Sequence, residues 1–212
     1  MISLKSALKL CLVIGPTDCY FYDMFTIIKE SIAGGITSIQ LRDKNLDEKH
    51  IYELGKRVLK TLPSSFLLII NDYVDVAKKL KVAVHLGQSD MECCLARKRL
   101  GKNSIIGLSI ENIEQAKYYQ YSEIDYFGIG PVFSTTSKLN VSQDIGIEGL
   151  KDIFKLLSHK PCLAIGGIST YNIDLLNKIG IDGIAVISAI TQSKQPCLVA
   201  QTLLKSRNKS ND

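Results

Sequence analysis

Residues 66–86 read FLLIINDYVDVAKKLKVAVHL and contain the unit that decides the fold. Two short apolar runs, 66–70 and 83–86, flank a segment at 75–80 with apolar residues at helical spacing. Apolar runs of this length are too short for buried helices and are typical of strands in a parallel sheet. The stretch therefore predicts a strand, a helix and a second strand.

The same alternation extends along the chain in both directions. Strands are predicted at 10–14, 38–41, 66–70, 83–86, 104–108, 126–129, 162–165 and 183–187. Helices are predicted at 24–33, 47–62, 75–80, 93–100, 114–121, 149–157, 171–178 and 189–204. Eight such units in 212 residues predict one α/β domain, a single (β/α)₈ TIM barrel at about 10–204 with a frayed tail at 205–212. A doubly wound open sheet is the alternative, because alternation alone does not require the sheet to close.

The composition is that of an ordinary globular domain, with 46% hydrophobic and 22% charged residues. It excludes disordered, collagen-like and coiled-coil chains, and no apolar run approaches the ~18–20 residues of a membrane helix. The net charge of +5 comes without a run of basic residues, so it is weak evidence for a nucleic-acid partner; a small anionic ligand fits it equally well, and plain solubility explains it best. We expect the six cysteines to be free thiols and find no signal-peptide pattern near the start, which together predict a cytoplasmic protein.

Polar residues gather where the predicted strands end, which is where barrel enzymes place their chemistry. They are Gln40-Leu41-Arg42-Asp43-Lys44, Asn71-Asp72, His85 to Asp90, Ser109, Gly130-Pro131, Thr135-Thr136-Ser137-Lys138, Gly166-Gly167 and Ser188. Two carboxylates, Asp72 and Asp90, come from neighbouring strands and face the cations of this rim. That combination suits Mg²⁺, which takes one or two carboxylates together with water and phosphate oxygens.

Simpler roles remain open for these charged residues. Each aspartate precedes a predicted helix and could be its N-cap. Arg42 and Lys44 could lie in a solvated loop and pair with Asp43. His85 is expected to be structural, and no serine–histidine–aspartate or cysteine–histidine set emerges that would indicate acyl transfer.

A phosphate site is predicted after the seventh and eighth strands. Gly166-Gly167 would let backbone N–H groups approach an anion, and Ser188 adds a hydroxyl. Two ordinary tight turns are the alternative. The segment from Ser134 to Asp144 is the longest without periodic apolar residues, and it would be either a lid over a polyanion or a flexible loop.

Six segments in register resemble the thiamine-phosphate synthase (thiamine-phosphate pyrophosphorylase) family. They are Gly35 to Lys44, Ile70 to Asp72, His85 to Met91, Gly128 to Phe133 with Lys138, Ala164 to Ile168, and Asp182 to Ile190. The chain departs from the family pattern at several positions. Ser89 stands where the family usually has an acidic residue, Ser134 where it has a proline, and Ser137 where it has a threonine. These changes bear on substrate affinity more than on reaction type.

The resemblance implies a (β/α)₈ transferase that joins hydroxymethylpyrimidine diphosphate to thiazole phosphate and releases diphosphate. It implies that Gln40 and Ser109 face the pyrimidine and that Asp72 and Asp90 bind Mg²⁺. The other implied substrate contacts are Leu41, Arg42, Asp43, Lys44, Asn71 and Lys138 on the diphosphate side, and Thr135, Ser137, Gly167, Ile187 and Ser188 on the thiazole phosphate side. Of these, Arg42, Lys44, Ser109 and Lys138 would act in catalysis.

Two other functions compete with this interpretation. A related thiazole tautomerase shares the fold and binds thiazole phosphate, but it releases no diphosphate and does not need the full diphosphate set. A non-catalytic barrel that binds phosphate ligands is the second alternative. The resemblance makes a homodimer plausible, and neither a nucleic acid nor a membrane is expected as a partner.

Overall fold

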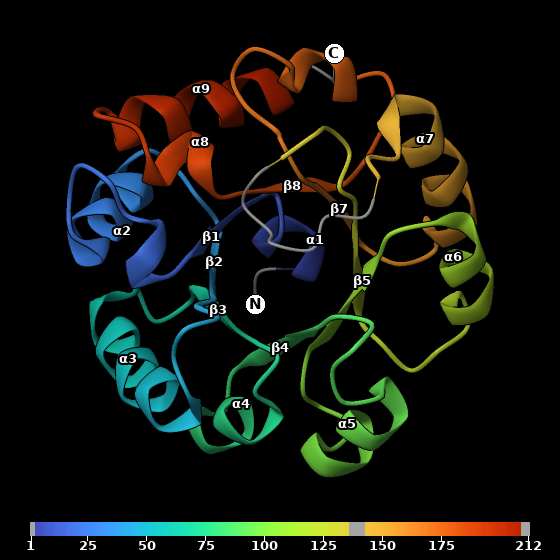
Figure 1. Cartoon of the computed structure of the whole chain (residues 1–212), viewed down its shortest axis with the longest axis horizontal. Helices are drawn as coiled ribbons and strands as arrows, with labels where there is room; N and C mark the ends of the chain where they lie inside the picture. The colour runs from blue at the N-terminus through green and yellow to red at the C-terminus, as the bar shows by residue number, and fades with distance from the viewer. Residues whose placement is uncertain (1–2, 136–142, 209–212) are drawn as a thin grey trace.

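Eight parallel strands close into a barrel in the computed structural model, which describes residues 3–135 and 143–208 (Figure 1). The strands are β1 (Leu10–Ile14), β2 (Ser38–Leu41), β3 (Leu67–Asn71), β4 (Ala83–Leu86), β5 (Ile106–Ile110), β6 (Tyr126–Ile129), β7 (Cys162–Ile165) and β8 (Gly183–Val186). The first strand pairs with the second and also with the last, where Leu10 is in register with Ile184. The barrel prediction is confirmed, and the open-sheet alternative is wrong.

Except for the first, the helices of the described residues lie around the barrel and cover its outer face (Figure 1). They are α1 (Leu4–Ala7), α2 (Met24–Ala33), α3 (Glu48–Thr61), α4 (Val74–Leu80), α5 (Cys93–Leu100), α6 (Ile113–Tyr119), α7 (Gly146–Leu157), α8 (Ser188–Thr191) and α9 (Pro196–Asn208), with 3₁₀ turns η1 (Pro16–Asp18) and η2 (Ile173–Leu176). The short α1, which the sequence did not predict, lies within the ring of strands in Figure 1. Leu4 and Leu8 pack there against the residues that fill the barrel.

Alternate residues along each strand face opposite sides, as the two-residue period of a strand requires. In β1, Leu10, Leu12 and Ile14 belong to the large core between strands and helices, whereas Cys11 and Val13 belong to the smaller core inside the barrel. All six cysteines are free thiols, as predicted. Among the described residues, no helix is long and apolar enough to cross a membrane.

Several predicted segments differ from the observed ones. The fifth strand begins at Ile106 rather than at residue 104. The helix predicted at 171–178 is only the 3₁₀ turn η2, and the helix predicted at 189–204 is two helices, because Pro196 begins a new one. The tail prediction is wrong at 205–208, since α9 continues to Asn208.

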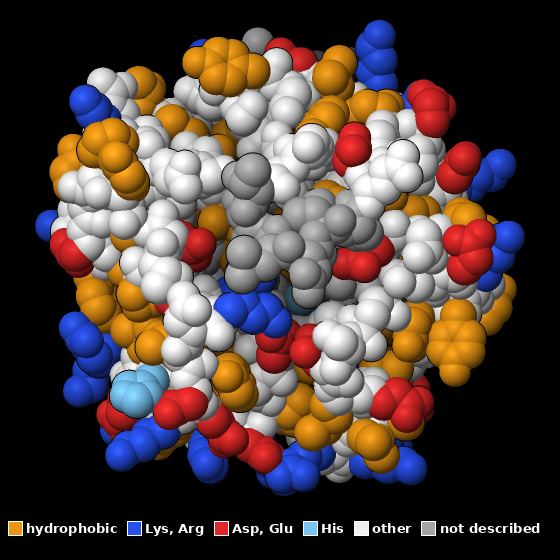
Figure 2. Space-filling model, viewed as in Figure 1, with side chains coloured by type: hydrophobic (Ala, Val, Ile, Leu, Met, Phe, Trp, Pro, Cys, Tyr) orange, Lys and Arg blue, Asp and Glu red, His pale blue; other side chains and the backbone are white. Residues whose placement is uncertain are grey.

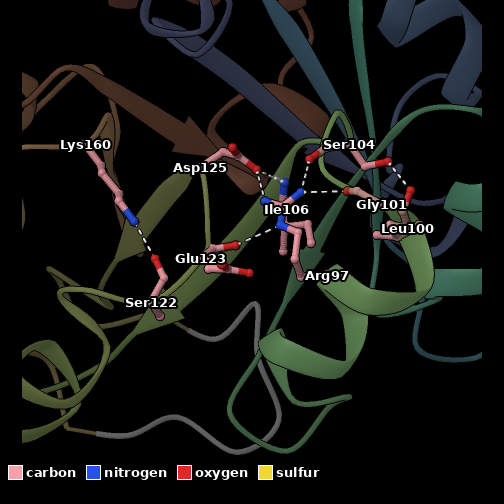
Figure 3. A network of polar contacts seen from close by, with 9 residues as sticks. All are labelled: Arg97, Leu100, Gly101, Ser104, Ile106, Ser122, Glu123, Asp125 and Lys160. Atoms are coloured by element: carbon pink, nitrogen blue, oxygen red, sulfur yellow. Dashed lines mark hydrogen bonds and ion pairs between the residues drawn. The ribbon is translucent and has the colours of Figure 1, made fainter.

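A buried arginine anchors the loops at the end of the barrel where the strands begin (Figure 3). Arg97 is buried, and its guanidinium donates to the carbonyls of Glu123, Gly101 and Ser104 and to the carboxylate of Asp125. The same carboxylate oxygen accepts the backbone N–H of Ile106 at 2.7 Å. The network therefore fixes the segments that lead into β5 and β6.

Arg97→Met is expected to lower the free energy of unfolding by about 2 kcal/mol, because it leaves buried acceptors without their donor. For a chain of this length, the melting temperature should fall by about 4–8 °C. Arg99→Met on the same helix is the matched control, since Arg99 pairs with Asp75 at the surface and its side chain is 51% exposed. Surface pairs contribute about 0–1 kcal/mol, so equal shifts in the two variants would contradict this role.

Candidate active site

Two carboxylates and a lysine meet after β3 and β4, at the end of the barrel where the strands finish. The ammonium nitrogen of Lys44 lies 2.8 Å from Oδ2 of Asp72, and the Asp72 carboxyl contacts that of Asp90. Asp90 accepts the backbone N–H of Gly87 at 2.6 Å, which ties it to the loop after β4. Acidic and basic side chains adjoin near the centre of this face (Figure 2).

The backbone holds Asp72 in an unusual conformation. Its φ is +65°, in the left-handed region that non-glycine residues rarely adopt, and its N–H donates to the carbonyl of His85. Tyr73 is the N-cap of α4 and Glu92 is that of α5, so the N-cap alternative for Asp72 and Asp90 is wrong. The alternative pairing of Lys44 with Asp43 is also wrong, because Lys44 pairs with Asp72.

The electrostatics of this cluster suit a divalent cation. The pKa of Asp72 is raised to about 6, chiefly by burial and also by the neighbouring Asp90, while Lys44 acts in the opposite direction. Two carboxyl groups in contact compete for one proton, and a divalent cation satisfies both of them. Among the described residues, no group of three or more acidic, histidine or cysteine side chains could hold a metal alone. Two carboxylates plus substrate oxygens and water are the ligand set that Mg²⁺ uses, so Asp72 and Asp90 fit this ion.

The residues at the end of β2 that were predicted to contact substrate differ in where their side chains lie. Some lie at the mouth of the barrel, and others lie in the protein interior. Arg42 is half-buried and lies near Asp18. The Asp43 carboxylate accepts the hydroxyl of Thr17 at 2.9 Å and is buried, so it fixes the loop after β1. Leu41 is fully buried in the core beneath the helices. The side chains of Asp43 and Leu41 are therefore held by the protein itself.

The inside of the barrel below this cluster contains a line of polar side chains. Nε2 of His85 lies 2.9 Å from Oγ of Ser109, and its Nδ1 lies 3.0 Å from the hydroxyl of Tyr126. Gln40 is buried beside Tyr126. Asn71 ends β3 in register with His85. The predicted pyrimidine contacts, Gln40 and Ser109, thus lie at the two ends of one polar cluster.

A pocket lies after β7 and β8. These strands are on the opposite side of the barrel from β3 and β4, which precede Asp72 and Asp90 (Figure 1). Its lining comprises Pro131, Thr135, Ile165, Gly166, Gly167, Ile168, Ala185, Val186, Ile187 and Ser188. Gly166 and Gly167 have φ of +99° and +62°. A Cβ on Gly167 would lie 2.6 Å from the carbonyl oxygen of Ser134, so only glycine fits there.

The pocket brings together the described residues predicted to bind the thiazole phosphate. Thr135, Gly167 and Ser188 line both this pocket and an adjoining one that opens toward Gln192. Sequence reasoning missed Asn172, whose amide donates to the carbonyl of Gly167 at 2.8 Å and holds the loop in place. Ser137 and Lys138 lie outside the described residues.

Comparison with known proteins agrees with this geometry. A family model described as thiamine monophosphate synthase matches residues 10–190. The thiamine-phosphate synthase of Clostridium botulinum strain 657 is 41% identical over 180 residues, which cover 84% of this chain and 87% of that protein. The corresponding protein of Desulfitobacterium hafniense is 37% identical over 91% of both chains. The solved structure of thiamine phosphate pyrophosphorylase from Pyrococcus furiosus superposes with a TM-score of 0.88 and 32% identity, covering 99% of this chain and all of that one.

Proposed function

The chain belongs to the thiamine monophosphate synthase family of transferases, and from that premise we propose how its own residues join a pyrimidine diphosphate to a thiazole phosphate. The observation that carries the proposal is the position of the Asp72–Asp90–Lys44 cluster across the barrel mouth from the Gly167 pocket. One end suits a diphosphate with a cation, and the other suits a monophosphate. The reacting carbon and nitrogen then meet between them.

The diphosphate end activates the leaving group. Lys44 and Arg42 hold the diphosphate oxygens, and Lys138 is predicted from the sequence to join them. Asp72 and Asp90 would hold Mg²⁺, whose charge would offset the negative charge that grows on the departing diphosphate. Gln40 and Ser109 orient the aminopyrimidine, whose ring can stabilise positive charge at the methylene carbon. The carbon–oxygen bond to the diphosphate can then break without a protein nucleophile.

The glycine pocket positions the second substrate. The phosphate of the thiazole lies against the backbone at Gly167 and the hydroxyls of Thr135 and Ser188. This placement directs the thiazole nitrogen toward the methylene carbon, where its lone pair forms the new carbon–nitrogen bond. Holding two reactants in this geometry makes the step effectively unimolecular.

A diphosphate-release assay tests the proposal. The protein should release diphosphate from the pyrimidine substrate only when thiazole phosphate and Mg²⁺ are both present, with thiamine phosphate formed in equal amount. Isomerisation of a thiazole phosphate tautomer without diphosphate release would instead identify a tautomerase. Binding of thiazole phosphate with neither reaction would identify a non-catalytic barrel.

Gly167→Ala is expected to raise the KM for thiazole phosphate by about 10-fold or more, because the new methyl group needs the space now taken by the carbonyl of Ser134. Gly180→Ala is the matched control, since Gly180 also has a positive φ, +77°, but nothing within 4 Å of the position of a Cβ. Both variants carry the backbone strain of a left-handed alanine, about 1 kcal/mol. Only the first should alter KM, and equal KM values in the two would count against a phosphate site at Gly167.

We also propose that the enzyme works in the cytoplasm as a homodimer. Six free thiols favour a reducing compartment. Sedimentation velocity at micromolar concentration measures the oligomeric state directly, and a monomer there would refute the dimer.

A further inference from the structure

A continuous line of hydrogen-bonding side chains crosses the inside of the barrel beneath the proposed pyrimidine site. The Tyr126 hydroxyl lies 3.0 Å from Nδ1 of His85, and Nε2 of the same ring lies 2.9 Å from Oγ of Ser109. Tyr126 is fully buried and His85 is 8% exposed, whereas Ser109 is half-buried. The line therefore runs from the closed interior toward the open mouth.

Two glycines leave the space that these rings occupy. Gly107 is in register with both His85 and Tyr126, and a Cβ on it would lie 2.1 Å from the tyrosine ring. Gly128 is in register with Ser109, and a Cβ there would lie 3.0 Å from Cε1 of His85. Any larger residue at these two positions would displace a ring, so the packing fixes where both rings lie.

The chemistry of the three groups determines which of them donates and which accepts in each hydrogen bond of the line. Burial raises the pKa of the Tyr126 hydroxyl well above its ordinary value, so it keeps its proton, although a hydrogen bond from the Gln40 amide acts the other way. A phenol is a stronger acid than an alcohol, so the imidazole accepts from Tyr126 rather than from Ser109. A neutral imidazole that accepts at Nδ1 must donate at Nε2. Ser109 thus accepts from His85, and its own proton is directed elsewhere.

We propose that Tyr126 and His85 are positioning residues that hold the Ser109 hydroxyl as a hydrogen-bond donor to the ligand at the barrel mouth. The inference rests on the proposed function, because it assigns the group that Ser109 meets as an acceptor, such as a pyrimidine ring nitrogen. A ligand with an acceptor at that position would be favoured, because the proton of Ser109 is not used by His85 and is available to the ligand. The histidine expected to be only structural therefore contributes to substrate selection.

Nuclear magnetic resonance of the substrate-free protein tests the direction of the line. The chain has three histidines, and the exposed His50 and His159 can be assigned with the variants His50→Gln and His159→Gln. Two-bond nitrogen–proton couplings then identify the tautomer of His85. The proposal expects the Nε2–H tautomer in the wild type and a mixture in Tyr126→Phe. The Nδ1–H tautomer in the wild type would overturn it.

Kinetics test whether the line acts through Ser109. Tyr126→Phe should lower kcat/KM for the pyrimidine diphosphate about 10-fold and leave the KM for thiazole phosphate unchanged. In a Ser109→Ala background, the same substitution should change kcat/KM less than twofold, because the hydroxyl that it orients is gone. Tyr126→Phe effects of equal size in both backgrounds would mean that Tyr126 is merely structural, and would overturn the proposal.

The controls separate this inference from the proposed function. Tyr22→Phe removes a surface hydroxyl that donates to the carbonyl of Lys194, and it should leave the kinetics unchanged. Thermal melting checks that each variant is folded. If the wild type released no diphosphate, the proposed function would be wrong, whereas the tautomer of His85 would still decide the direction of the line.

Discussion

Asp72→Asn and Asp90→Asn are each expected to lower kcat/KM at limiting Mg²⁺ by at least ~10-fold, and the double variant by ~100-fold or more. Asparagine keeps the size and one acceptor oxygen of the carboxylate but removes its charge. Each substitution therefore weakens a ligand of the proposed metal site without opening a cavity. The Mg²⁺ concentration that gives half-maximal activity should rise in both single variants.

Folding should be unaffected or slightly improved in the Asp72 and Asp90 variants, because the contact between the two carboxyl groups is relieved. Asp75→Asn on α4 is the matched control. The carboxylate of Asp75 also pairs with a cation, Arg99, and its side chain is only 33% exposed, but Asp75 lies outside the Asp72–Asp90–Lys44 cluster. Its activity and Mg²⁺ dependence should match those of the wild type. Near-full activity of both Asp72→Asn and Asp90→Asn at limiting Mg²⁺ would rule out the metal assignment.

Lys44→Ala should lower kcat by roughly 10²-fold, the usual loss when one positioned electrostatic donor is removed. The ammonium of Lys44 lies 2.8 Å from the carboxylate of Asp72, so it is already directed at the proposed diphosphate site. Negative charge on the diphosphate grows as the bond to carbon breaks, and a cation there stabilises the transition state more than the bound substrate. Steady-state kinetics with saturating thiazole phosphate measure the effect.

Lys79→Ala provides the comparison for Lys44. Lys79 pairs with Glu48 at 3.5 Å, and its side chain is 62% exposed, close to the 55% of Lys44. An exposed pair of this kind contributes little to stability, so Lys79→Ala should change neither kcat nor the melting temperature measurably. A Lys44 variant that kept its kcat and raised only KM would show that Lys44 binds substrate and transition state equally.

Much of the fold could be predicted from the sequence because each strand is a short apolar run between polar turns. The strands at 10–14 and 126–129 and the helix at 93–100 have the predicted bounds. The errors arise where side chains compete with backbone pairing. Asn172 bonds the backbone of Ser169 and Gly167, which replaces the expected helix at 171–178 by a 3₁₀ turn. Ser104 is held by Arg97 instead of joining β5.

The candidate site was predictable to the extent that strand ends converge in a closed barrel. That rule alone brings Asp72 near Asp90 and Gly167 near Ser188, although the two residues of each pair are far apart in the sequence. The interior line of Tyr126, His85 and Ser109 could not be predicted, because nothing in one sequence indicates which inward-facing residues of different strands meet. Glycines at positions 107 and 128 were the one local signal, since glycine inside a strand often marks a close approach.

Closure of the strand ladder between β1 and β8 also governs the distance between the two ends of the active site. The width of a barrel follows from its number of strands and their stagger, and a ladder without a free edge cannot widen by sliding one strand past another. Side chains at either end can adjust how tightly a phosphate is held, but they cannot change the span across the mouth. The backbone therefore fixes the span across the mouth, which limits the length of the molecule that can be assembled there.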